Sequence, residues 1–142
     1  LQQSSAASDV YKRQRIYHAL IEGRPEKNNG IIHEWLLEDK FLRVKAVNEN
    51  HPNAKEAITY WSVEDSDEFA SLLSLTIETG RRHQIRVGLA NLGHPVVGDK
   101  QHGAEGNPIG RIALHASSLE LLHPETDDPV RFEATIPFGP EN

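Results

Sequence analysis

TGRRHQIRVGLANLG, residues 79–93, is the stretch where the hydrophobic pattern of the chain changes from a period of two to a period of 3.6. Three apolar residues recur here at helical spacing: Ile85, Leu89 and Leu92. Gly93 supplies a C-terminal stop, and Thr79 or Gly80 is the expected N-cap. The stretch therefore predicts one amphipathic helix.

Three arginines stand at the expected opening of this helix: Arg81, Arg82 and Arg86. A cation at a helix N-terminus destabilises the helix by up to about 1 kcal/mol, because the macrodipole and the unpaired N–H groups favour anions there. Arg82 and Arg86 are four residues apart, so we expect them on one side of the helix. The pattern indicates an anion site for a phosphate or a carboxylate, and the alternative is a solvated first turn.

Alternating apolar and polar residues on both sides of this stretch predict strands. The expected strands cover residues 15–21, 31–37, 41–47, 57–63, 69–78, 111–122 and 130–136. In the clearest of them we expect one apolar face: Phe69, Leu73, Leu75 and Ile77. Six or seven strands and one helix predict an α+β fold with a mixed, mainly antiparallel sheet and few helices.

The bulk composition limits the classes of protein that fit. A length of 142 residues suits one domain, and the absence of cysteine excludes disulfides and thiolate metal sites. No apolar run approaches the roughly 20 residues that cross a bilayer. The net charge is −6, yet residues 81–111 carry five basic and two acidic side chains, a local charge of +3. This pattern favours an enzyme that touches a polyanion at one site.

The start of the chain does not fit the rest. The sequence begins at Leu1 and contains no methionine, and residues 1–13 are mostly small and polar without periodicity. We expect a fragment, or a foreign start, and treat residues 1–13 as a non-native or disordered leader.

Other chemistries have weaker support in the sequence. The eight histidines include no pair at the i, i+4 spacing of a helical zinc site, so no metal is expected. A histidine-metal hydrolase stays open as an alternative that requires clustered imidazoles. No G-x-S-x-G motif marks a serine nucleophile, and the glycine-bearing loops 98–103 and 103–110 are interpreted as ordinary turns.

Two longer runs carry a family resemblance: TGRRHQIRVGLANLGHPVVGDKQHG (79–103) and RIALHASSLELLHP (111–124). They are similar to the RluA-like family of pseudouridine synthases, whose motifs are TGR-x-HQIR-x-H, G-x-P-[IV]-x-GD-x-x-YG and LHA. RIYHALIEGRP (15–25) resembles the family's K-x-Y-x-A-x-V-x-G segment, and PVRFEATIP (129–137) its closing strand. The resemblance covers about residues 15–138 in the family's order.

The resemblance implies an RNA-modifying isomerase that flips a uridine out of structured RNA, ribosomal or transfer, and rejoins the base through carbon. It implies no cofactor and no metal, a cytoplasmic location and no membrane. Matched residue by residue, Tyr17 stacks on the flipped base, Arg86 pairs with the nucleophilic aspartate and Leu114 lines the base pocket. Four residues are expected at the RNA: Arg81, Arg82, His83 and Gln84. Tyr17 and Leu114 could alternatively be core residues.

The chain departs from the family at its most important residue. The family's nucleophile lies in HRLD upstream of the tyrosine segment, and here the only acidic residue before Tyr17 is Asp9, in SAASDVYK. We therefore expect residues 14–142 to be the C-terminal portion of a catalytic domain, inactive alone. Gly88 and His102 stand where the family has His and Tyr. The competing hypothesis is a non-catalytic RNA-binding module.

Overall fold

The computed structural model describes residues 14–81, 83–122 and 129–133. Seven strands form its framework: β1 (Gln14–Glu22), β2 (Asn29–Glu38), β3 (Val44–Val47), β4 (Lys55–Ser66), β5 (Ala70–Ile77), β6 (Leu114–Leu122) and β7 (Pro129–Glu133). Among the described residues, the helices are α2 (Gln84–Leu92) and a short 3-10 helix, η1 (Lys100–His102). The leader expected at residues 1–13 lies outside this described part.

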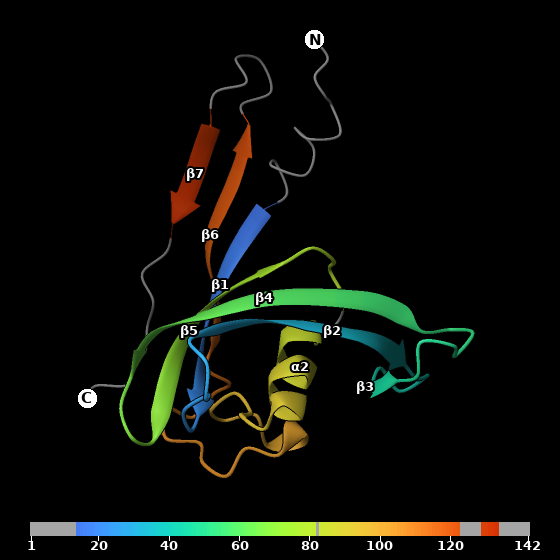
Figure 1. The fold of residues 1–142 in the computed structure, drawn as a ribbon, viewed down its shortest axis with the longest axis horizontal. Coiled ribbons are helices and arrows are strands. Elements are labelled where there is room, and N and C mark those ends of the chain that lie inside the picture. The colour runs from blue at the N-terminus through green and yellow to red at the C-terminus, as the bar shows by residue number, and fades with distance from the viewer. Residues whose placement is uncertain (1–13, 82, 123–128, 134–142) are drawn as a thin grey trace.

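The strands make one twisted sheet in the order β3-β2-β4-β5-β1-β6-β7. Each neighbouring pair is antiparallel. In Figure 1, β2 and β4 lie across the molecule while β1, β6 and β7 run steeply, which shows the twist. The expected α+β fold with a mainly antiparallel sheet is confirmed.

Helix α2 covers one face of the sheet (Figure 1). Ile85 and Leu89 of α2 are buried together with strand residues such as Leu73 and Leu75. Period-two alternation puts Leu73 and Leu75 on the same face of β5, which is why one helix can cover both. This shared core holds α2 at a defined place over the centre of the sheet.

The helix begins later than the sequence predicted. Its N-cap is His83, which has a left-handed φ of 56°, and not Thr79 or Gly80. The stretch before it is a loop organised by the buried amide of Gln84, whose oxygen accepts hydrogen bonds from the Thr79 hydroxyl (2.7 Å) and the Arg81 backbone N–H (3.2 Å). Arg81 and Arg82 therefore precede the helix, and only Arg86 lies in its first turn.

The predicted end of α2 is confirmed. Gly93 adopts a left-handed φ of 99°, and its N–H donates to the carbonyl of Ala90. A residue with a Cβ would be strained there. The chain then returns to the sheet through a bridge between Val96 and Ile21.

Turns shorten two of the expected strands. β3 starts at Val44 and not at 41, because Asp39 accepts hydrogen bonds from the backbone N–H groups of Phe41 and Arg43 and so holds a tight turn. β5 starts at Ala70, and Phe69 lies in the preceding turn with 75% of its surface exposed. The prediction that Phe69 shares the apolar face of β5 was wrong, since Asp67 ties its N–H into that turn.

Candidate active site

Tyr17 and Leu114 lie on one face of the sheet, in neighbouring strands. Tyr17 of β1 is opposite Leu75 of β5 and Ala116 of β6, and Ala19 is opposite Leu114. The register therefore makes Leu114 the diagonal neighbour of Tyr17, within reach of an aromatic ring. Both side chains are half-buried and pack against the core cluster that includes residues of α2.

Arg86 projects from the first turn of α2 and is held by a carboxylate. Its Nε donates to Asp99 Oδ2 at 2.9 Å and its Nη2 to Asp99 Oδ1 at 2.8 Å. A weaker bond of 3.4 Å joins Nη2 to Gln101 Oε1. This two-point grip fixes the plane of the guanidinium, so Nη1 is its only nitrogen without a hydrogen bond to the described residues.

Asp99 is a fully buried acid, with a relative exposure of 0%. Its backbone carbonyl accepts hydrogen bonds from the N–H groups of His102 and Ala104, which folds the loop around it. Burial raises the pKa of Asp99, but hydrogen bonds and the positive charge of Arg86, with a smaller contribution from His102, outweigh burial and lower the pKa below its usual 3.8. The side chain is therefore ionised at neutral pH.

A second basic side chain completes the surroundings of Asp99. His102 Nδ1 lies 3.1 Å from Asp99 Oδ2 and 3.2 Å from Oδ1. The ring of His102 meets that of His83 edge to face, with centroids 5.9 Å apart. Arg86, Asp99 and the two histidines thus form one array between α2 and η1. His102, which stands where the family has a tyrosine, is part of this array.

Gly88, the other departure from the family pattern, lies where α2 packs tightly against β2. A Cβ at this position would lie 3.2 Å from Ile32 Cγ2 and 3.3 Å from Glu34 Oε1. Helix α2 therefore approaches β2 closely at Gly88, and the side chains of Ile32 and Glu34 would have to shift by a few tenths of an ångström to admit a Cβ there.

The four residues expected at the RNA occupy different positions. Arg81 is exposed, and its Nε donates to the carbonyl of Glu56 (2.9 Å). His83 is half-buried at the N-cap, and Arg82 lies outside the described residues. Gln84 is only 3% exposed, and its Nε2 donates to the Ile58 carbonyl and to Thr59 Oγ1, both at 3.0 Å. Its amide joins α2 to β4.

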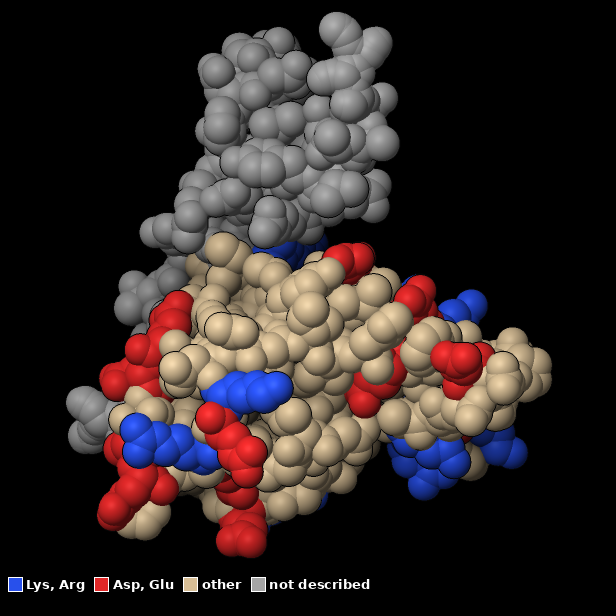
Figure 2. Space-filling view, viewed as in Figure 1, with Lys and Arg blue, Asp and Glu red and all other residues tan. Residues whose placement is uncertain are grey.

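Charges on the molecular surface are mixed. On the face shown in Figure 2, acidic and basic side chains alternate over the lower body, and basic side chains gather below the end of the sheet that carries β3. Basic side chains on this face are therefore grouped locally, as the uneven charge along the sequence also indicates.

Sequence reasoning missed Asp99. The loop 98–103 was interpreted as an ordinary turn, yet it delivers the anion that Arg86 binds. The available clue was charge: within the basic block 81–111, the only acidic residues are Asp99 and Glu105. The anion expected at the helix opening is thus a carboxylate of the chain itself.

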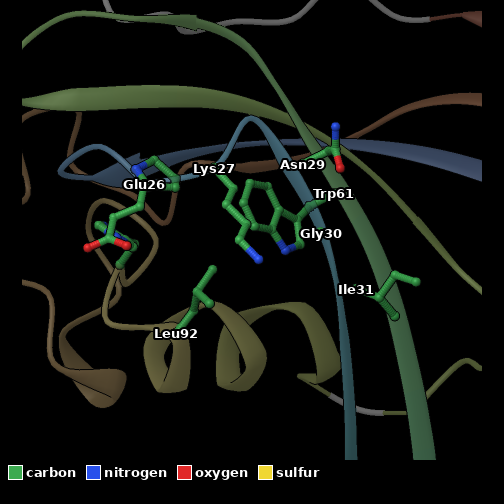
Figure 3. A pocket seen from close by; sticks show the side chains of 9 residues that line it. Glu26, Lys27, Asn29, Gly30, Ile31, Trp61 and Leu92 are labelled. Atoms are coloured by element: carbon green, nitrogen blue, oxygen red, sulfur yellow. The ribbon is translucent and has the colours of Figure 1, made fainter.

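A pocket in the described part of the chain lies away from these residues. It has a volume of about 690 Å³ and opens between the start of β2, β4 and the C-terminal end of α2. Figure 3 shows the indole of Trp61 beside Gly30, with Lys27 and Leu92 around it. Neither Tyr17, Arg86 nor Leu114 lines this pocket. Within the described part of the chain, no helix is long and apolar enough to cross a membrane.

Known proteins share both the sequence and the fold. An uncharacterized RNA pseudouridine synthase of Bacillus subtilis, YhcT, is 37% identical over 130 residues, which is 90% of this chain and 42% of the relative. Ribosomal large subunit pseudouridine synthase D of Blochmanniella floridana is 30% identical over 139 residues, 85% of this chain and 42% of the relative. The chain thus spans about two fifths of these curated relatives.

Solved structures agree with this similarity. Human RNA pseudouridylate synthase domain containing 1 superposes with a TM-score of 0.76 at 25% identity, covering 99% of this chain and 63% of that one. The family model described as RNA pseudouridylate synthase matches residues 3–91, more than half of the chain, and starts within the segment expected to be a leader. The chain therefore belongs to the RNA pseudouridylate synthase family.

Proposed function

We propose that the protein containing this chain is an RNA pseudouridine synthase, to which the chain contributes Tyr17, Arg86 and Leu114. The observation that carries the proposal is the fixed guanidinium of Arg86, held by Asp99 on the helix that packs over the face of Tyr17 and Leu114. Family membership supports this reaction, and the geometry supports the proposed roles.

Arg86 is the proposed partner of the nucleophilic carboxylate. Asp99 takes its Nε and Nη2, which leaves the two N–H groups of Nη1 to bind a second carboxylate. A cation beside a nucleophilic aspartate keeps it ionised, because the opposite charge lowers the pKa of the carboxyl. Asp99 prevents this cation from moving, so the nucleophile would meet a donor that is already oriented.

Asp99 itself is unsuited to be the nucleophile. It is fully buried, and each of its oxygens accepts a hydrogen bond from Arg86. A uridine could not reach it without dismantling the loop that surrounds it. We therefore propose that the nucleophilic aspartate comes from a part of the protein outside this chain, and that the chain alone is inactive.

Tyr17 and Leu114 are proposed to hold the flipped base. A flipped nucleotide loses its stacking in the RNA, and an aromatic ring beside an apolar side chain restores part of that energy. Their diagonal placement across β1 and β6 provides such a pair of surfaces. The Tyr17 hydroxyl is then available for proton transfer at the base.

The proposed substrate is structured RNA, ribosomal or transfer, and the proposed location is the cytoplasm. Arg81 and Arg82, just before α2, would contact phosphates, with His83 beside them. Gln84 is proposed to act indirectly, because its buried amide fixes the loop that carries the two arginines.

Tritium release tests the proposal. Pseudouridine formation replaces the C5–H bond of uridine by the new glycosidic bond, so RNA labelled with tritium at C5 loses its label. A longer protein that adds an HRLD aspartate to this chain should release tritium, and this chain alone should not. Arg86→Lys should lower the rate in the longer protein by roughly a hundredfold or more. The matched control is Arg43→Lys, at an exposed arginine with a similar aspartate partner, which should leave the rate unchanged.

The competing function is a non-catalytic RNA-binding module. It predicts that the longer protein binds RNA but releases no tritium, and that Arg86→Lys does not alter any rate. Tritium release by this chain alone would contradict the proposal that its nucleophile lies elsewhere.

A further inference from the structure

Among the described residues, the sheet contains two register shifts, and each skips one residue in its ladder. In the β4–β5 ladder, Val63 is opposite Leu73 and Asp65 is opposite Leu72, so Glu64 is skipped. In the β1–β6 ladder, the shift similarly skips Ser117. These are β-bulges, which bend a strand and change the direction of nearby side chains.

A single imidazole binds both skipped residues. His18 Nδ1 lies 2.6 Å from Ser117 Oγ, and His18 Nε2 lies 3.1 Å from Glu64 Oε2. The ring of His18 and the side chain of Ser117 are buried, with residue exposures of 8% and 5%. Ser74, the β5 residue between β1 and β4 at this level, is small, which leaves space for the contact across that strand.

The donors and acceptors of His18, Glu64 and Ser117 match one another. An ionised Glu64 only accepts, so His18 Nε2 carries a proton and donates it. In the neutral ring, Nδ1 then accepts from the Ser117 hydroxyl. In the protonated ring, Nδ1 donates to Ser117 Oγ, and the hydroxyl proton can turn to the His115 carbonyl, 3.4 Å away. The contact survives either charge state of the ring.

The bulge at Ser117 decides which face carries Leu114. Ile16 is opposite Ser118, and a regular ladder from that point would put Leu114 opposite Leu20. A one-residue slip moves every later side chain to the other face. With the bulge, Leu114 is opposite Ala19 and shares the face of Tyr17. The pairing of Tyr17 with Leu114 therefore depends on this one inserted residue.

We infer that His18 is a positioning residue that holds both bulges and thereby places Tyr17 beside Leu114. The link to catalysis rests on the proposed function, but the geometry does not. His18 follows Tyr17 directly in β1, and successive side chains of a strand point to opposite faces. His18 thus acts from the back of the sheet on the face where the base would bind.

NMR of this chain tests the geometry without any activity. In the wild-type chain, the Tyr17 ring should show nuclear Overhauser contacts to the Leu114 methyl groups, and the amides of 115–117 should exchange slowly. Ser117→Ala removes only the Oγ contact and should weaken these Overhauser contacts and speed amide exchange in β6. Glu64→Ala should have the same effect to a smaller degree, because Glu64 is more exposed than Ser117.

Ser71→Ala is the matched control. Ser71 is a fully buried serine of β5 whose hydroxyl donates to the Gly23 carbonyl at 2.8 Å. It is opposite Ile21 of β1, several residues from the bulge at Ser117, although it is only one residue from Leu72 beside the β4–β5 bulge. This variant should lower the melting temperature and keep the contacts between Tyr17 and Leu114. If Ser117→Ala also keeps those contacts and the slow exchange, the positioning role is wrong and Ser117 has a merely structural one.

Kinetics of the longer protein separate this inference from the proposed function. Ser117→Ala should lower kcat by roughly ten- to a hundredfold with little change in KM, because a small misplacement of a positioned group costs about this much. A lost Tyr17–Leu114 contact with unchanged kcat would uphold the positioning but contradict the proposed role of Tyr17. An intact contact with reduced kcat would overturn the positioning and leave the proposed function standing.

Discussion

Arg86 and Asp99 form a two-point ion pair in which the carboxylate is completely buried and the arginine side chain is 14% exposed. Forming such a pair costs free energy because both groups are desolvated. Removal of one partner is strongly destabilising, because the other is left buried and charged. The pair joins the first turn of α2 to the loop after Val96, which also contacts α2 through Gln101 and His102. It acts both as a structural link and as the means of orienting Arg86.

Arg86→Lys should lower the free energy of unfolding by about 2 kcal/mol, because lysine keeps the charge but cannot make two parallel hydrogen bonds. Urea unfolding followed by Trp fluorescence measures the change. Arg43→Lys is the control, since the Arg43 and Asp39 side chains are 67% and 38% exposed. It should cost less than about 1 kcal/mol. Equal losses in the two variants would show that burial of Asp99 contributes nothing.

Stability should fall in acid because of Asp99. Its pKa is lowered in the folded protein relative to the usual 3.8, so its contribution is fully present above about pH 4. That contribution is lost as the pH falls through the folded-state pKa, below 3.8. Unfolding free energies between pH 7 and 2.5 should therefore drop less for Asp99→Asn than for the wild type. An equal drop of the unfolding free energy in both proteins would contradict the proposed contribution of Asp99.

Gly30→Ala should destabilise the chain by about 1–3 kcal/mol, the usual cost of overpacking. A Cβ on Gly30 would lie 2.8 Å from Trp61 Cζ2, against the indole seen in Figure 3. Gly80→Ala is the matched control, because a Cβ there meets no atom within 4 Å. Thermal melts of the two variants provide the comparison. If both melt like the wild type, the indole can move away from β2 at no cost.

Arg81→Ala should reduce the salt dependence of RNA binding. Arg81 uses Nε for the Glu56 carbonyl, which leaves its terminal nitrogens for a phosphate. Losing one phosphate contact makes the negative slope of log K against the logarithm of the salt concentration shallower by about 1. Fluorescence anisotropy with a labelled structured RNA measures the slope. Arg24→Ala, at an exposed arginine in the turn before β2, should leave it unchanged.

The positions of the strands along the chain followed from local patterns. Alternation predicted each strand to within a few residues, because the period of apolar residues reports which side of a strand meets the core. Glycine after Leu92 also predicted the end of α2. The predicted start of α2 was wrong. Local propensity could not reveal that Gln84 buries its amide against β4 and holds the preceding residues in a loop.

The family and its candidate residues were accessible from ordered motifs along the chain. The partner of Arg86 was not, because Asp99 is thirteen residues away and becomes its neighbour only when the loop after Val96 folds back on α2. The bulges and their contact with His18 could not be predicted from the sequence either. The three residues involved come from three different strands and approach one another only in the assembled sheet, where β5 lies between β4 and β1: Glu64, His18 and Ser117. Periodicity along a chain records which residues are buried. Which charges and registers are matched depends on contacts between distant segments, and these exist only in the folded molecule.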